Sequence, residues 1–254
     1  MEMLSLIGQL LGVLALFGGA LLEGLHLQSI LVPTAALIVF GGTLAAVLVS
    51  FPARDVSRAL GSVGKVFSPI EQEVQAVIDE IGKVAALARK EGILAVEQIR
   101  SEIQNPLLKR SIKFVIDGFD GVTLKEILEN EIDQAFDEDE TAGRVWEAAG
   151  GYAPTIGIIG AVLGLIHVMQ SLDDPSKIGG GIAVAFVATV YGVAGANLVF
   201  LPWGSKLRRR AHLEATVKEL VKIGVLGIQE GLNPHFLHQK LQVFLREGPS
   251  SESL

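Results

Sequence analysis

The sequence of 254 residues contains no cysteine, which excludes disulfides, thiolate metal sites and cysteine nucleophiles. Its five histidines do not have the spacing of zinc ligands. It also lacks a glycine-rich phosphate loop followed by Lys-Ser or Lys-Thr, the common nucleotide-binding motif. The sequence therefore argues against an enzyme and predicts no cofactor and no metal. With a net charge of -7 and only a short basic run, the chain is also a poor candidate for nucleic-acid binding.

Charge is missing altogether from four long stretches. Residues 3–22, 24–53, 148–172 and 178–205 contain no Asp, Glu, Lys or Arg. A helix needs roughly 20 residues to cross a hydrocarbon core of about 30 Å, and each stretch is long enough. The mean hydropathy of +0.47 agrees with this class. The sequence predicts an all-α integral membrane protein with four transmembrane helices. The first stretch is interpreted as a retained span, because the first basic residue of the chain is Arg54.

The spans divide the chain into membrane and polar segments. We expect a transmembrane hairpin over 1–52, a cytoplasmic helical domain over 53–147, the third and fourth spans over 148–205, and a cytoplasmic helical tail over 206–254. Lysines and arginines gather directly after the second and the fourth span, whereas the two short links hold a single lysine. The positive-inside bias therefore predicts that both termini are cytoplasmic.

The polar segments carry helix signals. Candidate helix starts are a capping box over 68–71, the pair Asn105-Pro106, and a second capping box over 123–126. Apolar residues recur at three- and four-residue steps and mark one helix face: Val74, Val77, Ile78, Ile81, Val84 and Ala85.

Two helices are predicted to extend beyond the membrane. No proline interrupts the chain between Thr123 and Pro154, so this helix can continue into the third span. The fourth span is expected to continue into a basic helix over 206–230, which the turn signals over 231–234 stop; a short helix over 236–245 follows. The acidic run 137–140 is interpreted as a solvated face rather than a metal site.

Small residues line one face of the third and of the fourth span. Their three- and four-residue spacing lets helix backbones approach closely in lipid, where packing drives association. This pattern is compatible with ordinary helix packing and with an oligomer built around a central element. The residues are Gly157, Gly160, Ala161 and Gly164 on the third span, and Gly181, Ala185, Ala188, Gly192 and Gly195 on the fourth.

Few polar groups lie within the spans, and none is a carboxylate, lysine or arginine. An ion pathway usually needs an ionisable group, so a carboxylate would have to come from another chain. Thr155 and Thr189 offer hydroxyls, although such hydroxyls often only bind a carbonyl of the preceding turn. Pro154 and Pro202 stand at the cytoplasmic ends of spans three and four, where they mark either boundary kinks or a pair of hinges.

Three stretches carry a resemblance to a known family: 152–164, 185–192 followed by Pro202, and 88–97. In turn they resemble the third span, the fourth-span signature and the rotor-facing stretch of the A subunit of bacterial flagellar motor stators, the MotA/PomA family. Ala194 departs from the family, where a larger aliphatic residue is usual. The resemblance covers nearly the whole chain.

The resemblance implies a stator subunit of the flagellar motor in the bacterial inner membrane. It implies a homopentameric ring of this chain, embedded in membrane lipid, around two B subunits. Each B subunit would anchor to peptidoglycan and contribute a helix with an ion-binding Asp. Ion flow would then drive torque on the rotor protein FliG. The transmembrane gradient would be the energy source, with no cofactor.

Residue roles also follow from the resemblance. Thr189 would line the ion path beside the partner's Asp, together with Ala161 and Thr155. Pro154 and Pro202 match the two family prolines that couple ion passage to movement. Because sodium-driven members carry a threonine at the position of Ala161, the resemblance predicts proton drive.

On the polar side, the resemblance assigns rotor contact to Arg89, Lys90 and Glu97. The eight residues between Arg89 and Glu97 correspond to just over two helical turns, so both would share one face if Gly92 leaves the helix intact.

Two other functions compete with this one. An ExbB/TolQ-like energiser of outer-membrane transport or envelope maintenance also pairs a pentameric helical subunit with a carboxylate-bearing partner. That family typically has three spans, and the hairpin before Arg54 argues against it. A small-molecule carrier or channel acting alone is weaker still, because no intramembrane charge is present.

Overall fold

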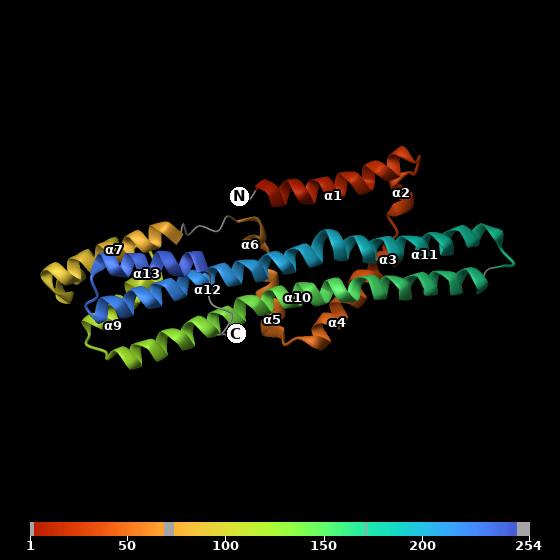
Figure 1. Cartoon of the computed structure of the whole chain (residues 1–254). Coiled ribbons are helices and arrows are strands. Elements are labelled where there is room, and N and C mark those ends of the chain that lie inside the picture. The colour runs from red at the N-terminus through yellow and green to blue at the C-terminus, as the bar shows by residue number, and fades with distance from the viewer. Residues whose placement is uncertain (1–2, 69–73, 171, 248–254) are drawn as a thin grey trace. The chain divides into compact units, whose positions relative to one another are not determined.

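The computed structural model describes residues 3–68, 74–170 and 172–247, and every regular element within these ranges is a helix (Figure 1). The first half contains α1 (Met3–Leu22), α2 (Leu27–Ile30), α3 (Pro33–Ala36), the π-helical turn η1 (Leu37–Gly41), α4 (Gly42–Ser50), α5 (Ala53–Gly61), α6 (Val63–Phe67), α7 (Val74–Glu91), α8 (Val96–Ile99) and α9 (Pro106–Ile116). The second half contains α10 (Gly121–Gln170), α11 (Pro175–Gly195), the π-helical turn η4 (Ala196–Phe200), α12 (Leu201–Gln229) and α13 (Pro234–Glu247).

Four helical segments are long and apolar enough to cross a membrane, which confirms the predicted all-α membrane protein. They are Met3–Leu22, Pro33–Ser50, Gly121–Gln170 and Ile178–Gln229. The last two run far beyond membrane thickness, since α10 has 50 residues. The predicted continuations of spans three and four into the polar segments are therefore confirmed.

The chain forms two compact units. The first lies within residues 1–69 and 139–209, and the second within residues 70–138 and 210–254. The acidic middle segment and the C-terminal tail thus contribute to one unit, while α10 and α12 each contribute to both. The predicted boundaries at 53, 148 and 206 were placed where charge begins or ends, and the packing units divide at other positions.

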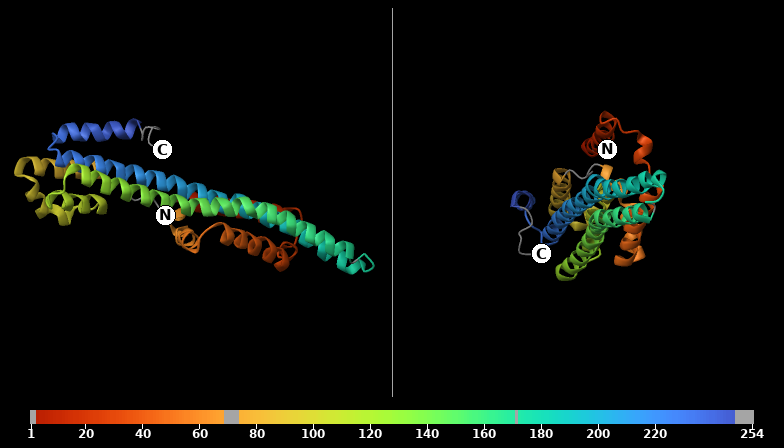
Figure 2. Two further views of the ribbon diagram at one scale, coloured as in Figure 1. Left: turned by 90° about the horizontal axis from the view of Figure 1, so that it is seen from below. Right: turned by 90° about the vertical axis from the view of Figure 1, so that its right-hand side faces the viewer.

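In the first unit, α10 and α11 lie side by side, as Figures 1 and 2 show from three directions. The second span packs on α11 through a small buried cluster that contains Ala35, Val39, Val187 and Ala188. The first span instead contacts α6 and η4. The sequence predicted a hairpin of spans one and two, but it did not indicate that the first span contacts α6 and η4.

An aromatic cluster lies at the end of the first unit where α12 begins. Trp146 stacks on Phe200, with ring centroids 5.9 Å apart, and meets Trp203 edge-on at 5.1 Å. Phe67 also meets Trp203 edge-on, with ring centroids 5.9 Å apart. The indole Nε1 of Trp146 donates to the carbonyl of Ala59 at 3.0 Å. Amphipathic rings with a satisfied N–H are typical of a membrane–water interface.

The second unit has the larger apolar core. The predicted apolar face of α7 is buried against α9, α12, α13 and the start of α10, and Val74 packs at its edge. Full burial of an aliphatic side chain contributes about 1.5–3 kcal/mol, so these contacts dominate the stability of the unit. The largest side chains with almost no exposure are Ile78, Ile81, Leu108, Ile112, Leu124, Leu128, Leu220, Leu237 and Leu241.

Helix starts agree only in part with the sequence. Asn105 caps α9, because its side chain accepts from the N–H of Leu108 at 3.0 Å, as predicted. The capping box at Thr123 is wrong. Asp120 is the actual cap, and its Oδ1 accepts from the N–H groups of Val122 and Thr123 at 3.0 Å. Thr123 instead donates its hydroxyl to Asp120 at 2.6 Å. The capping box over 68–71 lies largely outside the described residues.

Candidate functional site

The small-residue faces of spans three and four meet each other within one chain. A Cβ at Gly157 would lie 2.9 Å from the carbonyl oxygen of Ala188, and one at Gly192 would lie 2.5 Å from that of Ala153. A Cβ at Gly164 would lie 2.7 Å from the backbone nitrogen of Ala185. Because the two backbones touch, even alanine has no room at these positions. Of the two interpretations, helix packing within the chain is confirmed for this α10–α11 seam.

Two of the three predicted pathway residues belong to this seam. The Cα of Thr189 is 3.5 Å from the Cβ position of Gly157. Ala161 follows Gly157 by four residues and precedes Gly164 by three, so it shares their helix face. Thr155 differs, because it is exposed on α10. The structure therefore brings Ala161 and Thr189 to one seam and leaves Thr155 outside it.

Both threonine hydroxyls bind their own helix. Thr189 Oγ1 donates to the carbonyl of Ala185 at 3.2 Å, and Thr155 Oγ1 donates to that of Tyr152 at 2.8 Å. A hydroxyl that donates to a carbonyl still keeps its lone pairs. Thr189 can therefore still offer an oxygen to a cation or to a protonated carboxyl group.

The two prolines differ in their surroundings. Pro154 lies inside α10, which continues past it to Gln170. Pro202 is the second residue of α12 and directly follows the π-helical turn η4. Proline and π turns are both established causes of helix bending. Of the two proline sites, only that at Pro202 adjoins a π turn.

An ion network that the sequence did not predict joins α10 to α12. Arg208 donates to Glu140 at 2.9 Å and to Glu147 at 3.2 Å, and Arg144 also pairs with Glu140. Only 9% of Glu140 is exposed, so the interpretation of run 137–140 as a solvated face is wrong at this residue. The hydrogen bond from Arg144, opposed by burial and reinforced by Arg208, lowers the pKa of Glu140.

Two glycines position this network. A Cβ at Gly204 would lie 2.9 Å from the carbonyl oxygen of Gly143, and one at Gly143 would lie 2.9 Å from that of Gly204. The helices therefore touch through backbone at this level, which brings Arg208 within reach of carboxylates on α10. The paired Gly143 and Gly204 were the signal available in the sequence, but Gly143 lies outside the uncharged stretches and is far from Gly204 in the chain.

The lowered pKa of Glu140 predicts a loss of stability in acid. A carboxyl whose pKa is lower when folded stabilises the protein above its unfolded pKa, and that contribution disappears as pH falls through the folded pKa. Glu140→Gln should therefore flatten the fall in melting temperature of the solubilised protein below about pH 5, where the unfolded carboxyl begins to take up its proton while the folded one stays ionised. Glu126→Gln, on an exposed part of the same helix, is the control. An unchanged slope in Glu140→Gln would contradict the assignment.

The predicted rotor-facing residues do not share one uninterrupted helix. Gly92 has a φ of +86°, outside the right-handed helical region, and α7 ends at the residue before it. The condition under which Arg89 and Glu97 would share one helix face, that Gly92 leaves the helix intact, is therefore not met. Arg89 is exposed and donates to the carbonyl of Gly231 at 2.8 Å. Lys90 pairs with its neighbour Glu91, and Glu97 pairs with Arg100 at 3.0 Å.

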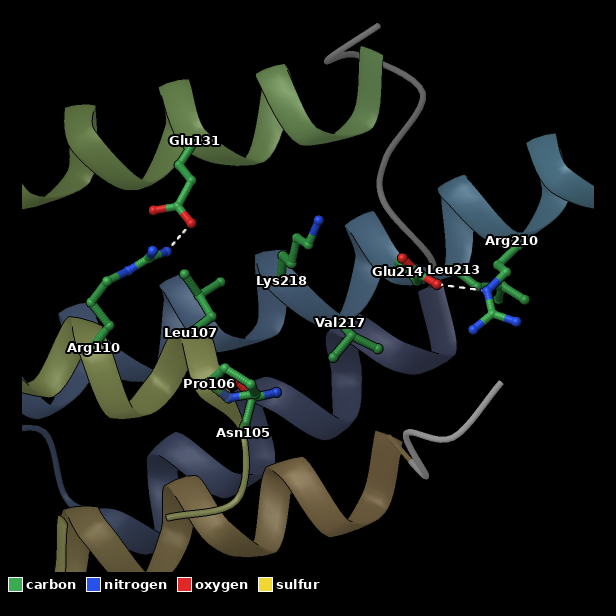
Figure 3. Close-up of a pocket in the computed structure, with 10 residues that line it drawn as sticks. All are labelled: Asn105, Pro106, Leu107, Arg110, Glu131, Arg210, Leu213, Glu214, Val217 and Lys218. Carbon is green, nitrogen blue, oxygen red and sulfur yellow. Dashed lines mark hydrogen bonds and ion pairs between the residues drawn. The ribbon is translucent and has the colours of Figure 1, made fainter. Parts of the chain in front are cut away.

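A pocket of about 400 Å³ opens between α9, α10 and α12 in the second unit (Figure 3). Arg110 on α9 pairs with Glu131 on α10, and Arg210 donates to Glu214 on α12 at 2.7 Å. Its two carboxylates are therefore already paired with arginines. Among the described residues, no group of three or more His, Asp or Glu side chains could hold a metal ion.

Comparisons with known proteins agree over the whole chain. Residues 6–92 match the family described as Motility protein A N-terminal, and residues 99–219 match the MotA/TolQ/ExbB proton channel family. The chain is 32% identical to motility protein A of Bacillus subtilis (strain 168), with 96% of this chain and 91% of that protein covered. It is 35% identical to chemotaxis protein PomA of Vibrio alginolyticus, with 98% and 97% covered.

Two solved structures have the same fold. The structure of C. jejuni MotAB matches with a TM-score of 0.89 and 30% identity, and all of both chains is covered. The flagellar MotAB stator complex of Bacillus subtilis matches with a TM-score of 0.85 and 32% identity, and 94% of each chain is covered.

Proposed function

This chain belongs to the motility protein A family of flagellar motor stator subunits, and from this premise we propose how its residues generate torque. The observation that carries the proposal is the match of the entire chain to a MotAB structure. We propose that the chain assembles with a B subunit that supplies the carboxylate missing from its own spans. Five copies would surround the B subunits in the inner membrane, with both termini in the cytoplasm.

The α10–α11 seam is the proposed wall of the ion path. Thr189 would face the partner's carboxylate, and Ala161 would lie beside it on the neighbouring helix. Thr155, on the exposed face of α10, would act at the entrance, where another subunit can contact it. Each elementary charge that crosses the membrane releases about 2.3 kcal/mol per 100 mV. That energy, rather than any cofactor, would drive the movement.

The proposed coupling runs through Pro154 and Pro202 to the second unit. Both prolines lie where a membrane span continues into a long polar helix, so a change in bend can be transmitted along α10 and α12. Arg89, Lys90 and Glu97 are the proposed contacts to the rotor protein FliG. All three are exposed, so their charges can interact with groups on another protein.

Deletion of the gene that encodes this chain is expected to leave cells that build flagella but do not swim. Flagella are counted by electron microscopy, swimming is tracked in the same culture, and the parent chain is reintroduced as the control. In the same assay, Arg89→Glu should insert normally into the membrane but give less torque. Lys83→Glu, an exposed change on the same helix α7, should restore swimming fully.

Normal swimming after deletion would contradict the proposal, unless a second stator set is present and its removal then causes paralysis. The competing ExbB/TolQ-like function predicts a different defect, namely poor growth under iron limitation with normal motility. Growth on limiting iron therefore separates the two functions. Full torque from Arg89→Glu would contradict only the assigned rotor contact.

A further inference from the structure

The π-helical turn η4 lies directly before Pro202 in the fourth span. Proline has no N–H, so the carbonyl four residues earlier, that of Leu198, loses its α-helical donor. A carbonyl without a donor is costly in a membrane, and neighbouring helices commonly satisfy such a group. Leu198 lies inside η4, so the π turn and the missing donor affect the same part of the helix.

Gln9 of the first span supplies the donor. Its Nε2 donates to the carbonyl of Leu198 at 2.9 Å, and its Oε1 accepts from the indole Nε1 of Trp203 at 3.2 Å. The Leu198 carbonyl can only accept and the indole N–H can only donate, so a single amide orientation satisfies both. One side chain thus bridges the residues on both sides of Pro202.

Neighbouring contacts place Gln9 on the face of α1 that meets the fourth span. Ser5, one turn before Gln9, is hydrogen-bonded to Lys206. Gly12, one turn after Gln9, lies under Leu198, because a Cβ there would be 3.1 Å from Leu198 Cδ2. α1 has no buried residue, so this narrow face is its attachment to the helix that carries Pro202.

We propose that Gln9 is a positioning residue that braces the Pro202 bend, so that the first span sets the resting direction in which α12 leaves the membrane. The proposal rests on the coupling role proposed for Pro202. Movement at this bend must stretch or exchange the bonds from Gln9 to Leu198 and Trp203. Loss of a hydrogen bond of this kind is expected to shift the balance between two positions of the bend about three- to tenfold.

The functional test compares Gln9→Leu with Gln28→Leu in the deletion strain. Both changes remove an amide, but Gln28 is exposed on α2, whereas Gln9 is the residue that bonds Leu198 and Trp203. Gln9→Leu is expected to reduce rotation speed about threefold or more at unchanged protein level, while Gln28→Leu rotates like the parent. Equal speeds of the two variants would overturn the proposal.

A spectroscopic test is independent of motility. The chain has two tryptophans, so in a Trp146→Phe background fluorescence differences between variants of the full-length chain report on Trp203. Gln9→Leu should change the emission of Trp203, because its indole N–H loses its acceptor. Unchanged emission would overturn the proposal even if the speed falls.

Gln9→Glu keeps the proposal testable if Gln9→Leu folds poorly. An ionised carboxylate cannot donate to Leu198, whereas a protonated carboxyl group can both donate and accept. Its Trp203 emission should therefore match the parent near about pH 3, below the ordinary pKa of glutamate, and depart from it near about pH 8. A pH-independent spectrum would overturn the brace. Failure of the parent chain to restore swimming would instead contradict the proposed function, and the emission tests would still decide the brace.

Discussion

Gly164→Ala is expected to destabilise the protein and to abolish torque. The added Cβ would lie 2.7 Å from the nitrogen of Ala185 and 2.7 Å from the carbonyl oxygen of Gly181. Both atoms are backbone, so no side chain can rotate away, and the two spans must separate along the seam. Overpacking of this kind costs about 1–3 kcal/mol. Thermal unfolding of the detergent-solubilised protein should show a lower melting temperature, and tethered cells should not rotate.

Gly151→Ala is the matched control on the same helix, because nothing beyond its chain neighbours and the local helix backbone lies within 4 Å of its Cβ position. An exposed glycine in a helix gains up to about 1 kcal/mol when alanine replaces it, so this variant should be at least as stable as the parent. If Gly164→Ala and Gly151→Ala melt and rotate alike, spans three and four do not pack through the seam as described.

A motor built with this chain is expected to rotate without sodium and to stop when a protonophore is added. A sodium ion replaces its hydration shell with several oxygens, whereas a proton needs only one carboxylate. Ala161 contributes no side-chain oxygen to the seam, and Thr155 lies outside it. Thr189 is then the remaining hydroxyl among the three proposed pathway residues. Rotation speed in sodium-free buffer, with and without protonophore, tests this all-or-none difference.

The variants Ala161→Thr and Ala161→Val sharpen the test, because threonine and valine have nearly the same shape and differ by a hydroxyl. Sodium should affect speed in the threonine variant and leave the valine variant unchanged. A parent motor that stops in sodium-free buffer and survives the protonophore would contradict proton drive. Equal sodium responses of the two variants would contradict only the role of position 161.

The sequence predicted the helical elements well wherever one physical signal was sufficient. Uncharged length identified the four spans, apolar periodicity identified the buried face of α7, and Asn105-Pro106 marked the start of α9. It failed where two signals competed. Asp120 and Thr123 are both good caps, and only the backbone decides that Asp120 caps α10. The sequence left open whether Gly92 interrupts α7, and its φ of +86° shows that the helix ends before it.

By itself, the sequence determined the membrane class, the four spans, the continuation of two of them into polar helices, and the lack of any carboxylate, lysine or arginine within the spans. These properties depend on composition and on spacing within one segment, which the chain displays directly. Tertiary structure alone decided three contacts. The glycine faces of spans three and four meet each other, Arg208 reaches Glu140, and Gln9 donates to the carbonyl of Leu198, four residues before Pro202. Each of those contacts joins residues far apart in the chain, and their partners depend on helix positions and rotations that no local pattern specifies.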